Sequence, residues 1–137
     1  MIRRAEPRDE APLLGLTREF ATSFEVDEAA FRASFAALLD DPNAYLAVAE
    51  AGDGVIGYVL AFSHVTLYAN GRVAWVEELM VDAGCRKQGV GKALMQSAEA
   101  WAEERGCRLV ALATRRAAAF YEALAYEPSA TYYRKLF

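Results

Sequence analysis

The spacing of apolar residues changes from one segment of the chain to the next. Over residues 7–22 and 27–40 they recur every three or four positions, which is the period of an amphipathic helix. Residues 44–49, 55–65 and 72–81 are nearly continuous apolar runs, which are typical of buried strands. Helical and extended segments therefore alternate along the chain, and this order favours an α/β fold.

Turn-forming residues separate these segments. Gly52-Asp53-Gly54 and Ala69-Asn70-Gly71 predict hairpin turns, and Asn-Gly suits the positive φ that such turns need. The remaining segments are predicted from the same patterns: a strand over 2–5, a helix over 88–105 ended by Gly106, a strand over 108–113, a short helix over 115–124 and a last strand over 130–136. Because no linker, repeat or low-complexity tract interrupts them, residues 1–137 are expected to form a single domain.

Composition and charge exclude several classes of protein. With 55% hydrophobic and 25% charged residues, the chain has an ordinary globular balance. Its longest uncharged apolar run, residues 55–62, is far shorter than the ~20 residues that span a bilayer, and no secretory signal is visible. A net charge of −4 argues against nucleic-acid binding. Cys85 and Cys107 lack metal or redox spacing, so we expect a cytoplasmic protein without metal and without membrane or nucleic-acid partners.

Charge is also distributed unevenly. Acidic residues outnumber basic ones over residues 1–50, whereas basic residues slightly outnumber acidic ones over residues 51–137. The acidic excess has two interpretations, a cationic ligand bound by the first segment or an ordinary solvated helix surface, and both stay open.

The most informative segment lies between the strand over 72–81 and the helix that follows it. It contains two glycines and several side chains that donate hydrogen bonds: Arg86, Lys87, Gln88, Gly89, Val90, Gly91 and Lys92. The first N–H groups of a helix have no partner within it and carry partial positive charge, and glycine lets an anion approach them closely. The pattern therefore predicts a phosphate-bearing ligand at this turn.

Two common phosphate motifs do not fit this segment. A P-loop needs Ser or Thr after Gly91-Lys92, where the chain has Ala93, and a dinucleotide fingerprint needs a third glycine, where it has Leu94. The remaining pattern, Arg-x-x-Gly-x-Gly, resembles the pyrophosphate loop of the GNAT (Gcn5-related) N-acetyltransferases, whose donor is acetyl-CoA. Residues 2–9, 77–82 and 117–126 resemble the opening strand and turn, the strand before the loop and the closing segment of the same family, in the family's order.

This resemblance implies a fold and a mode of binding. The fold is a central mixed sheet of six to seven strands flanked by about four helices, in which the strands ending near Val81 and Ala113 splay apart and hold coenzyme A in the gap. The backbone amides of residues 88–92 are implied to bind the diphosphate, and the main chain of Leu79, Met80 and Val81 to pair with the pantetheine arm. Thr114 stands where many relatives have an asparagine that contacts this arm. Ala125 stands where the family has glycine; because alanine in a left-handed cap costs ~1–2 kcal/mol, the short helix is expected to end differently here.

The resemblance also implies two catalytic groups. An amine with a pKa of ~10.4 is protonated at pH 7, and removing its proton costs about 4.6 kcal/mol, so a general base is worth having. Since neighbouring strand residues face opposite sides, only one of Glu77 and Glu78 is expected to face the acceptor. The resemblance places the base at Glu77, on the face of Leu79 and Val81, with partial burial raising its pKa; Glu78 and His64 are the alternatives. Tyr121 matches the tyrosine that protonates the departing sulfur.

The sequence thus predicts transfer of an acetyl group from acetyl-CoA to an amine of a small molecule or peptide. Transfer of a longer acyl group and a non-catalytic acyl-CoA-binding or regulatory domain remain the alternatives. The protein is expected to be a monomer or a homodimer. Seven residues are expected to wall the acceptor site: Phe20, Phe24, Phe31, His64, Tyr68, Tyr132 and Tyr133.

Overall fold

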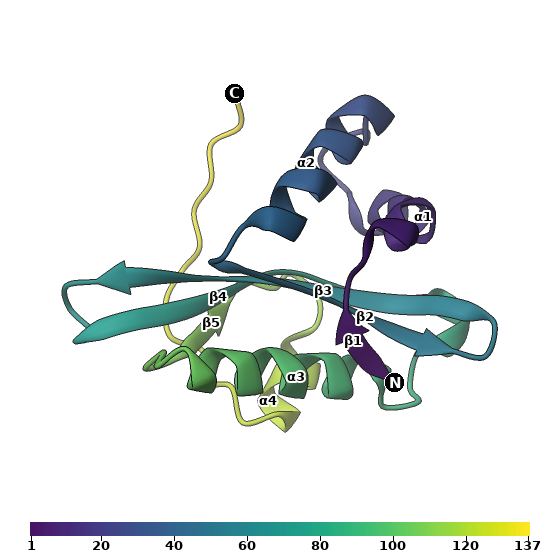
Figure 1. Cartoon of the computed structure of the whole chain (residues 1–137). Helices are drawn as coiled ribbons and strands as arrows, with labels where there is room; N and C mark the ends of the chain where they lie inside the picture. The colour runs from purple at the N-terminus through teal and green to yellow at the C-terminus, as the bar shows by residue number, and fades with distance from the viewer.

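Helices cover both faces of one sheet in this protein, for which a computed structural model describes residues 1–137 (Figure 1). Two helices lie on one face and two on the other. The elements follow in the order β1 (Ile2–Arg4), η1 (Pro7–Asp9), α1 (Glu10–Phe20), α2 (Glu28–Asp40), β2 (Ala44–Ala51), β3 (Gly54–Thr66), β4 (Gly71–Val81), η2 (Ala83–Cys85), α3 (Val90–Glu104), β5 (Val110–Leu112) and α4 (Ala118–Ala123).

The sheet is mixed, as predicted, and has five strands in the order β1-β2-β3-β4-β5. Neighbouring strands are antiparallel except β4 and β5, which are parallel. Between β3 and β4, Asn70 has a φ of 61°, so the positive φ expected of the Asn-Gly turn is confirmed. No helix combines the length and the apolar character that crossing a membrane requires.

The prediction of six to seven strands was wrong, because residues 130–136 pair with no strand. After α4 the chain rises beside the sheet toward the side of α1 and α2 (Figure 1). There the ring of Tyr132 stacks on Trp75 with centroids 6.3 Å apart, and Arg134 Nη1 donates to Ser23 Oγ at 2.8 Å. These side-chain contacts direct the segment across the sheet rather than along the outer edge of β5.

The two faces of the sheet bury separate cores. On the face of α3 the helix buries Leu94, Ala98, Trp101 and Ala102, which follow the spacing that the sequence predicts for this helix, and Met95 beside them. On the opposite face, Leu13 and Leu16 of α1 and Phe35 of α2 pack over the central strands. Each core fixes one set of helices, and the central strands carry side chains into both.

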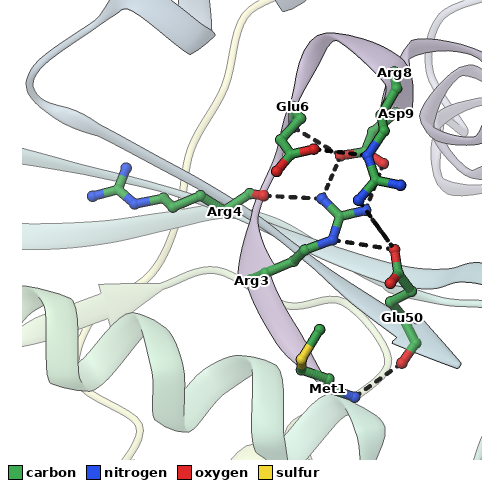
Figure 2. A network of polar contacts seen from close by, with 7 residues as sticks. All are labelled: Met1, Arg3, Arg4, Glu6, Arg8, Asp9 and Glu50. Carbon is green, nitrogen blue, oxygen red and sulfur yellow. Dashed lines mark hydrogen bonds and ion pairs between the residues drawn. The ribbon is translucent and has the colours of Figure 1, made fainter.

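An ion-pair network fixes the start of α1 to the sheet (Figure 2). The guanidinium of Arg3 on β1 donates to both oxygens of Asp9 at 2.8 and 2.9 Å, and to Glu50 on β2 at 2.6 Å. The backbone N–H of Glu6 also donates to Asp9. These contacts, Arg3 foremost, hold the pKa of the buried Asp9 carboxyl below its usual range. The network therefore positions α1 over the sheet.

The end of α4 differs from the sequence-based expectation. Ala125 adopts the left-handed conformation that was expected to be avoided, with a φ of 71°. The N–H of Tyr126 donates to the carbonyl of Tyr121 at 3.0 Å and that of Ala125 donates to Glu122 at 3.0 Å, which together form a Schellman cap. Tyr126 is also held by its hydroxyl, which donates to Glu99 of α3 at 2.6 Å. These contacts offset the backbone strain at Ala125.

Candidate functional site

The loop before α3 presents a row of free backbone amides. The N–H groups of residues 88–92 donate to no acceptor in the protein. Hydrogen bonding of the helix begins at Ala93, whose N–H donates to the carbonyl of Gly89 at 3.0 Å. Lys87 and Gly89 have φ values of 65° and 82° on either side of Gln88. Such changes of handedness turn successive N–H groups toward a common concavity that suits an anion.

The two glycines of the loop are required for different structural reasons. A side chain at Gly89 would meet nothing within 4 Å, but the positive φ strains any other residue there. At Gly91 a Cβ would lie 3.2 Å from the ring of Phe120, so this glycine lets α4 pack against the start of α3. Gly89 is thus required by its backbone conformation, and Gly91 by a close contact.

The charged side chains of the loop divide between two roles. Arg86 Nε donates to the carbonyl of Val81 at 3.1 Å, and the guanidinium also approaches the sulfur of Met80. Arg86 therefore ties the loop to the end of β4. Lys87 and Lys92 are exposed and form no ion pair within the chain, so both can add positive charge beside the free amides.

One edge of β4 is open next to this loop. β5 pairs only with Ala74, Trp75 and Val76, and the later part of β4 has no partner on that side. Leu79, Met80 and Val81 therefore have a free strand edge that leads to the loop. An extended amide-containing chain fits such an edge as an added strand does.

The two glutamates of β4 lie at a β-bulge. Leu60 pairs with Glu78 but the next residue, Ala61, pairs with Val76, so Glu77 is the extra residue of the bulge. Leu79 packs toward α3, whereas Glu78 pairs with Leu60 on the face of α1 and α2. The bulge interrupts the alternation from which Glu77 was placed on the face of Leu79, so that placement stays a prediction. Glu77 is exposed rather than partly buried.

Glu78 is the glutamate with an enclosed environment. The hydroxyl of Tyr58 donates to its Oε1 at 2.6 Å. Burial raises the pKa of the Glu78 carboxyl, and the nearby charge of Glu77 acts in the same direction, whereas the bond from Tyr58 opposes them. A carboxylate that gains a proton more readily than usual suits a general base. Tyr58 was not predicted as a site residue, because its only signal in the sequence is a polar hydroxyl within an apolar run.

A cavity of about 280 Å³ lies beside Glu78, between α1, α2 and the central strands. Nine of its thirteen lining residues are hydrophobic, so its walls are mainly apolar. Of the residues expected to wall the acceptor site, Phe31 alone lines this cavity. The side chains of Phe24, Tyr68 and Tyr133 are strongly exposed, and His64 is exposed on β3. That set was selected for aromatic character, and most of its members lie outside the cavity.

Tyr121 of α4 packs against the core on the α3 side of the sheet, and Thr114 lies between β5 and α4. The ring of Tyr121 meets that of Phe120 at 4.9 Å, and Phe120 in turn contacts Gly91 of the loop. The Tyr121 hydroxyl has no hydrogen-bond partner in the chain and is not sealed in the core, and burial of the side chain raises its pKa. The phenol therefore keeps its proton at neutral pH. The hydroxyl of Thr114 accepts from the N–H of Ala117 at 3.1 Å, ahead of α4.

Comparison with known proteins shows the family to which this chain belongs. Residues 13–126 match the acetyltransferase (GNAT) family. The chain belongs to the GNAT family. Members of this family take the acetyl group that they transfer from acetyl-CoA, and the predicted enzyme class, an acetyl-CoA-dependent acyltransferase, is confirmed.

Individual relatives cover nearly the whole of this GNAT chain. It is 31% identical to aminoalkylphosphonate N-acetyltransferase from Salmonella typhimurium, over 93% of this chain and 85% of that one. A transcriptional regulator from Bacillus halodurans has a similar structure, with a TM-score of 0.91, 25% identity and coverage of 100% and 99%. Glucosamine-6-phosphate N-acetyltransferase from Arabidopsis thaliana shares the fold with a TM-score of 0.85 at 19% identity, over 100% and 97%.

Proposed function

We propose that this GNAT protein transfers the acetyl group of acetyl-CoA directly to a primary amine. The observation that carries the proposal is the meeting of three features along β4: the free amides of the following loop, the open edge over residues 79–81, and the enclosed carboxylate of Glu78. A donor on one side of the strand and an acceptor on the other would meet at the bulge.

The donor would be held mainly by the protein backbone. The amides of residues 88–92 would bind the diphosphate, with Lys87 and Lys92 adding charge, while Leu79, Met80 and Val81 would pair with the pantetheine arm. The free hydroxyl hydrogen of Thr114 is a further candidate donor to this arm. Bound in this way, acetyl-CoA would supply an acetyl group that is already activated as a thioester.

Glu78 is the general base that the geometry supports best. Its side chain faces the cavity in which an amine would lie and is half-buried, and its raised pKa favours acceptance of a proton. Glu77, which the family resemblance favours, is exposed at the same bulge and remains the second candidate, reached through water. Distinguishing the two requires matched variants.

Tyr121 is proposed as the acid. In the balanced reaction the amine nitrogen forms a C–N bond with the acetyl carbon while the C–S bond breaks. The sulfur leaves with the electron pair of that bond and takes the proton of the Tyr121 hydroxyl. The proton of the amine passes to the carboxylate, and solvent restores both groups. The products are an N-acetyl amide and free coenzyme A.

The direct test measures release of free thiol when the purified protein is mixed with acetyl-CoA and a broad panel of primary amines. We expect release that depends on both the amine and the protein, with an N-acetylated product detected by mass spectrometry. Binding of acetyl-CoA without acetylation of any amine would contradict the proposal and favour the acyl-CoA-binding alternative. Faster reaction with longer acyl-CoA donors would instead favour transfer of another acyl group.

A further inference from the structure

The cavity beside Glu78 has a distinctive lining. Leu13, Phe31, Leu38 and Leu60 supply apolar walls from α1, α2 and β3. At about 280 Å³, its volume lies at the lower limit of ordinary ligand pockets, which run from roughly 300 to 1,000 Å³. A cavity of this size and chemistry suits a small molecule with a hydrocarbon or aromatic body, whereas a folded peptide segment exceeds it.

The charges that face the cavity all have one sign. Glu78 and Asp27 are its ionisable acids, and no Lys, Arg or His is among the lining residues. Arg32, on the same helix as Phe31, is engaged on the outside with Glu10 and Glu28. Asp27 is the one acidic residue of residues 1–50 that lines the cavity.

We infer that the acceptor is a small primary amine with an apolar body and no anionic group. This inference rests on the proposed function and narrows its substrate class. The ammonium group is drawn to Glu78, and the body replaces water along the apolar walls. A phosphonate, phosphate or carboxylate on the same molecule would lose its hydration without gaining a cation, and two carboxylates would repel it. The named acceptor of the Salmonella relative carries such an anionic group, so the two proteins are inferred to differ in acceptor.

A homologous series of amines tests this directly. Thiol release from acetyl-CoA is measured with n-propylamine, n-butylamine, n-pentylamine and n-hexylamine, and with 2-aminoethylphosphonate and β-alanine. We expect kcat/KM to rise about four-fold for each added methylene, the ratio that corresponds to ~0.8 kcal/mol per buried CH₂. The two anionic amines should react at least about 100-fold more slowly than n-propylamine, whose body has a similar length, because their charge is left without a partner. Equal or better reaction with the phosphonate would overturn the inference while leaving acetyl transfer intact.

A matched pair of variants locates the acceptor in this cavity. Ser34 is exposed on α2 and lines the cavity, whereas its neighbour Ala33 is exposed but does not line it. Ser34→Arg should raise KM for n-hexylamine at least about 10-fold and reduce the discrimination against 2-aminoethylphosphonate, because it adds the missing cation. Ala33→Arg places the same charge on the same helix and should change neither. Identical behaviour of the two variants would show that the amine binds elsewhere.

Binding without turnover separates this inference from the proposed function. Saturation-transfer NMR with n-hexylamine is recorded on the wild-type protein in the presence of coenzyme A, and again after Ser34→Arg. Binding that the variant weakens supports the assigned acceptor class even if no acetylation occurs, in which case the transfer reaction alone is wrong. No binding of n-hexylamine at millimolar concentrations would overturn the inference.

Discussion

The two faces of the sheet offer different kinds of groups to a ligand. On the face of α3, the features that suit coenzyme A are main-chain groups: the amides of residues 88–92 and the open edge of β4. On the face of α1 and α2, the features that suit an acceptor are side chains: Glu78, its partner Tyr58 and the apolar walls of the cavity. Substitutions on the first face are therefore constrained by backbone conformation, whereas those on the second can change the ligand without changing the fold.

The end of β4 presents side chains to both faces. Glu78 faces α1 and α2 whereas Leu79 faces α3, as ordinary strand alternation requires, so one strand serves both sides at consecutive residues beside the bulge. We therefore expect side-chain changes on the face of α1 and α2 to alter turnover and to leave the affinity for acetyl-CoA unchanged.

The largest effect is expected from Glu78→Gln. Removing the base should lower kcat/KM about 100-fold or more, and the Gln side chain can still accept the hydrogen bond from Tyr58. Glu77→Gln is the matched control, and it should retain most of the activity. The reverse outcome, a large loss in Glu77→Gln alone, would return the base to the residue favoured by the family resemblance.

The pH dependence of the same pair sharpens the assignment. Because the pKa of Glu78 is raised, its carboxyl is protonated at pH values where an ordinary carboxyl is already ionised, and a protonated carboxyl cannot act as a base. Activity should therefore rise with pH through an apparent pKa above the usual carboxyl value of ~4.3. The profile is recorded as kcat/KM against pH, and this acidic limb should be absent in Glu78→Gln.

The next largest effect is expected from Tyr121→Phe on the α3 side. Loss of the acid should lower kcat about 100-fold and leave the Kd for acetyl-CoA unchanged, because the ring packing is retained. Tyr126→Phe is the control, since its hydroxyl contacts Glu99 and lies outside the proposed chemistry. Wild-type kcat in Tyr121→Phe would remove the proposed acid role.

A third effect concerns how the acceptor face is held in place. Asp9→Asn should lower the free energy of unfolding by about 3 kcal/mol at pH 7, because it breaks the paired charge network at Arg3 and the start of α1. The folded-state pKa of Asp9 lies below its unfolded value of ~3.9, so its contribution is present above pH 4 and is lost as pH falls through the folded pKa.

Urea unfolding of the wild type and the variant at pH 7 and at successively lower pH measures this contribution. The difference between them should shrink in acid. Arg8→Ala, which removes an exposed pair with Glu6, should stay close to the wild type. A difference that persists unchanged at low pH would mean that the ion pair is not its source.

The smallest effect is expected at the end of α4. Ala125→Gly should raise the free energy of unfolding by about 1 kcal/mol, because glycine adopts the left-handed conformation without the cost that alanine bears. Ala123→Gly, within α4, should act in the opposite direction. Urea unfolding measures both, and destabilisation by Ala125→Gly would contradict the strain assigned to this position.

The sequence predicted the parts of the molecule that local patterns determine. Helical spacing defined the apolar face of α3, and the glycines of the loop indicated an anion site before any tertiary contact was known. It could not predict features that depend on registers and distant contacts. The bulge at Glu77 depends on the pairing of β3 with β4, and the cap at Ala125 depends on contacts of Tyr126 with α3. Residues 130–136 have the composition of a strand, but Trp75 and Ser23 direct them elsewhere.

The central claim is that the amides of residues 88–92 bind the diphosphate of coenzyme A, and calorimetry tests it most directly. S-acetyl-4′-phosphopantetheine and S-acetylpantetheine share the thioester and the arm, and the second lacks only the phosphate that would meet these amides. Loss of two charge-assisted hydrogen bonds, each worth roughly 1.5–3 kcal/mol, should weaken binding of S-acetylpantetheine at least about 100-fold. Equal affinity for the two compounds, or no binding of acetyl-CoA at millimolar concentrations, would contradict the account.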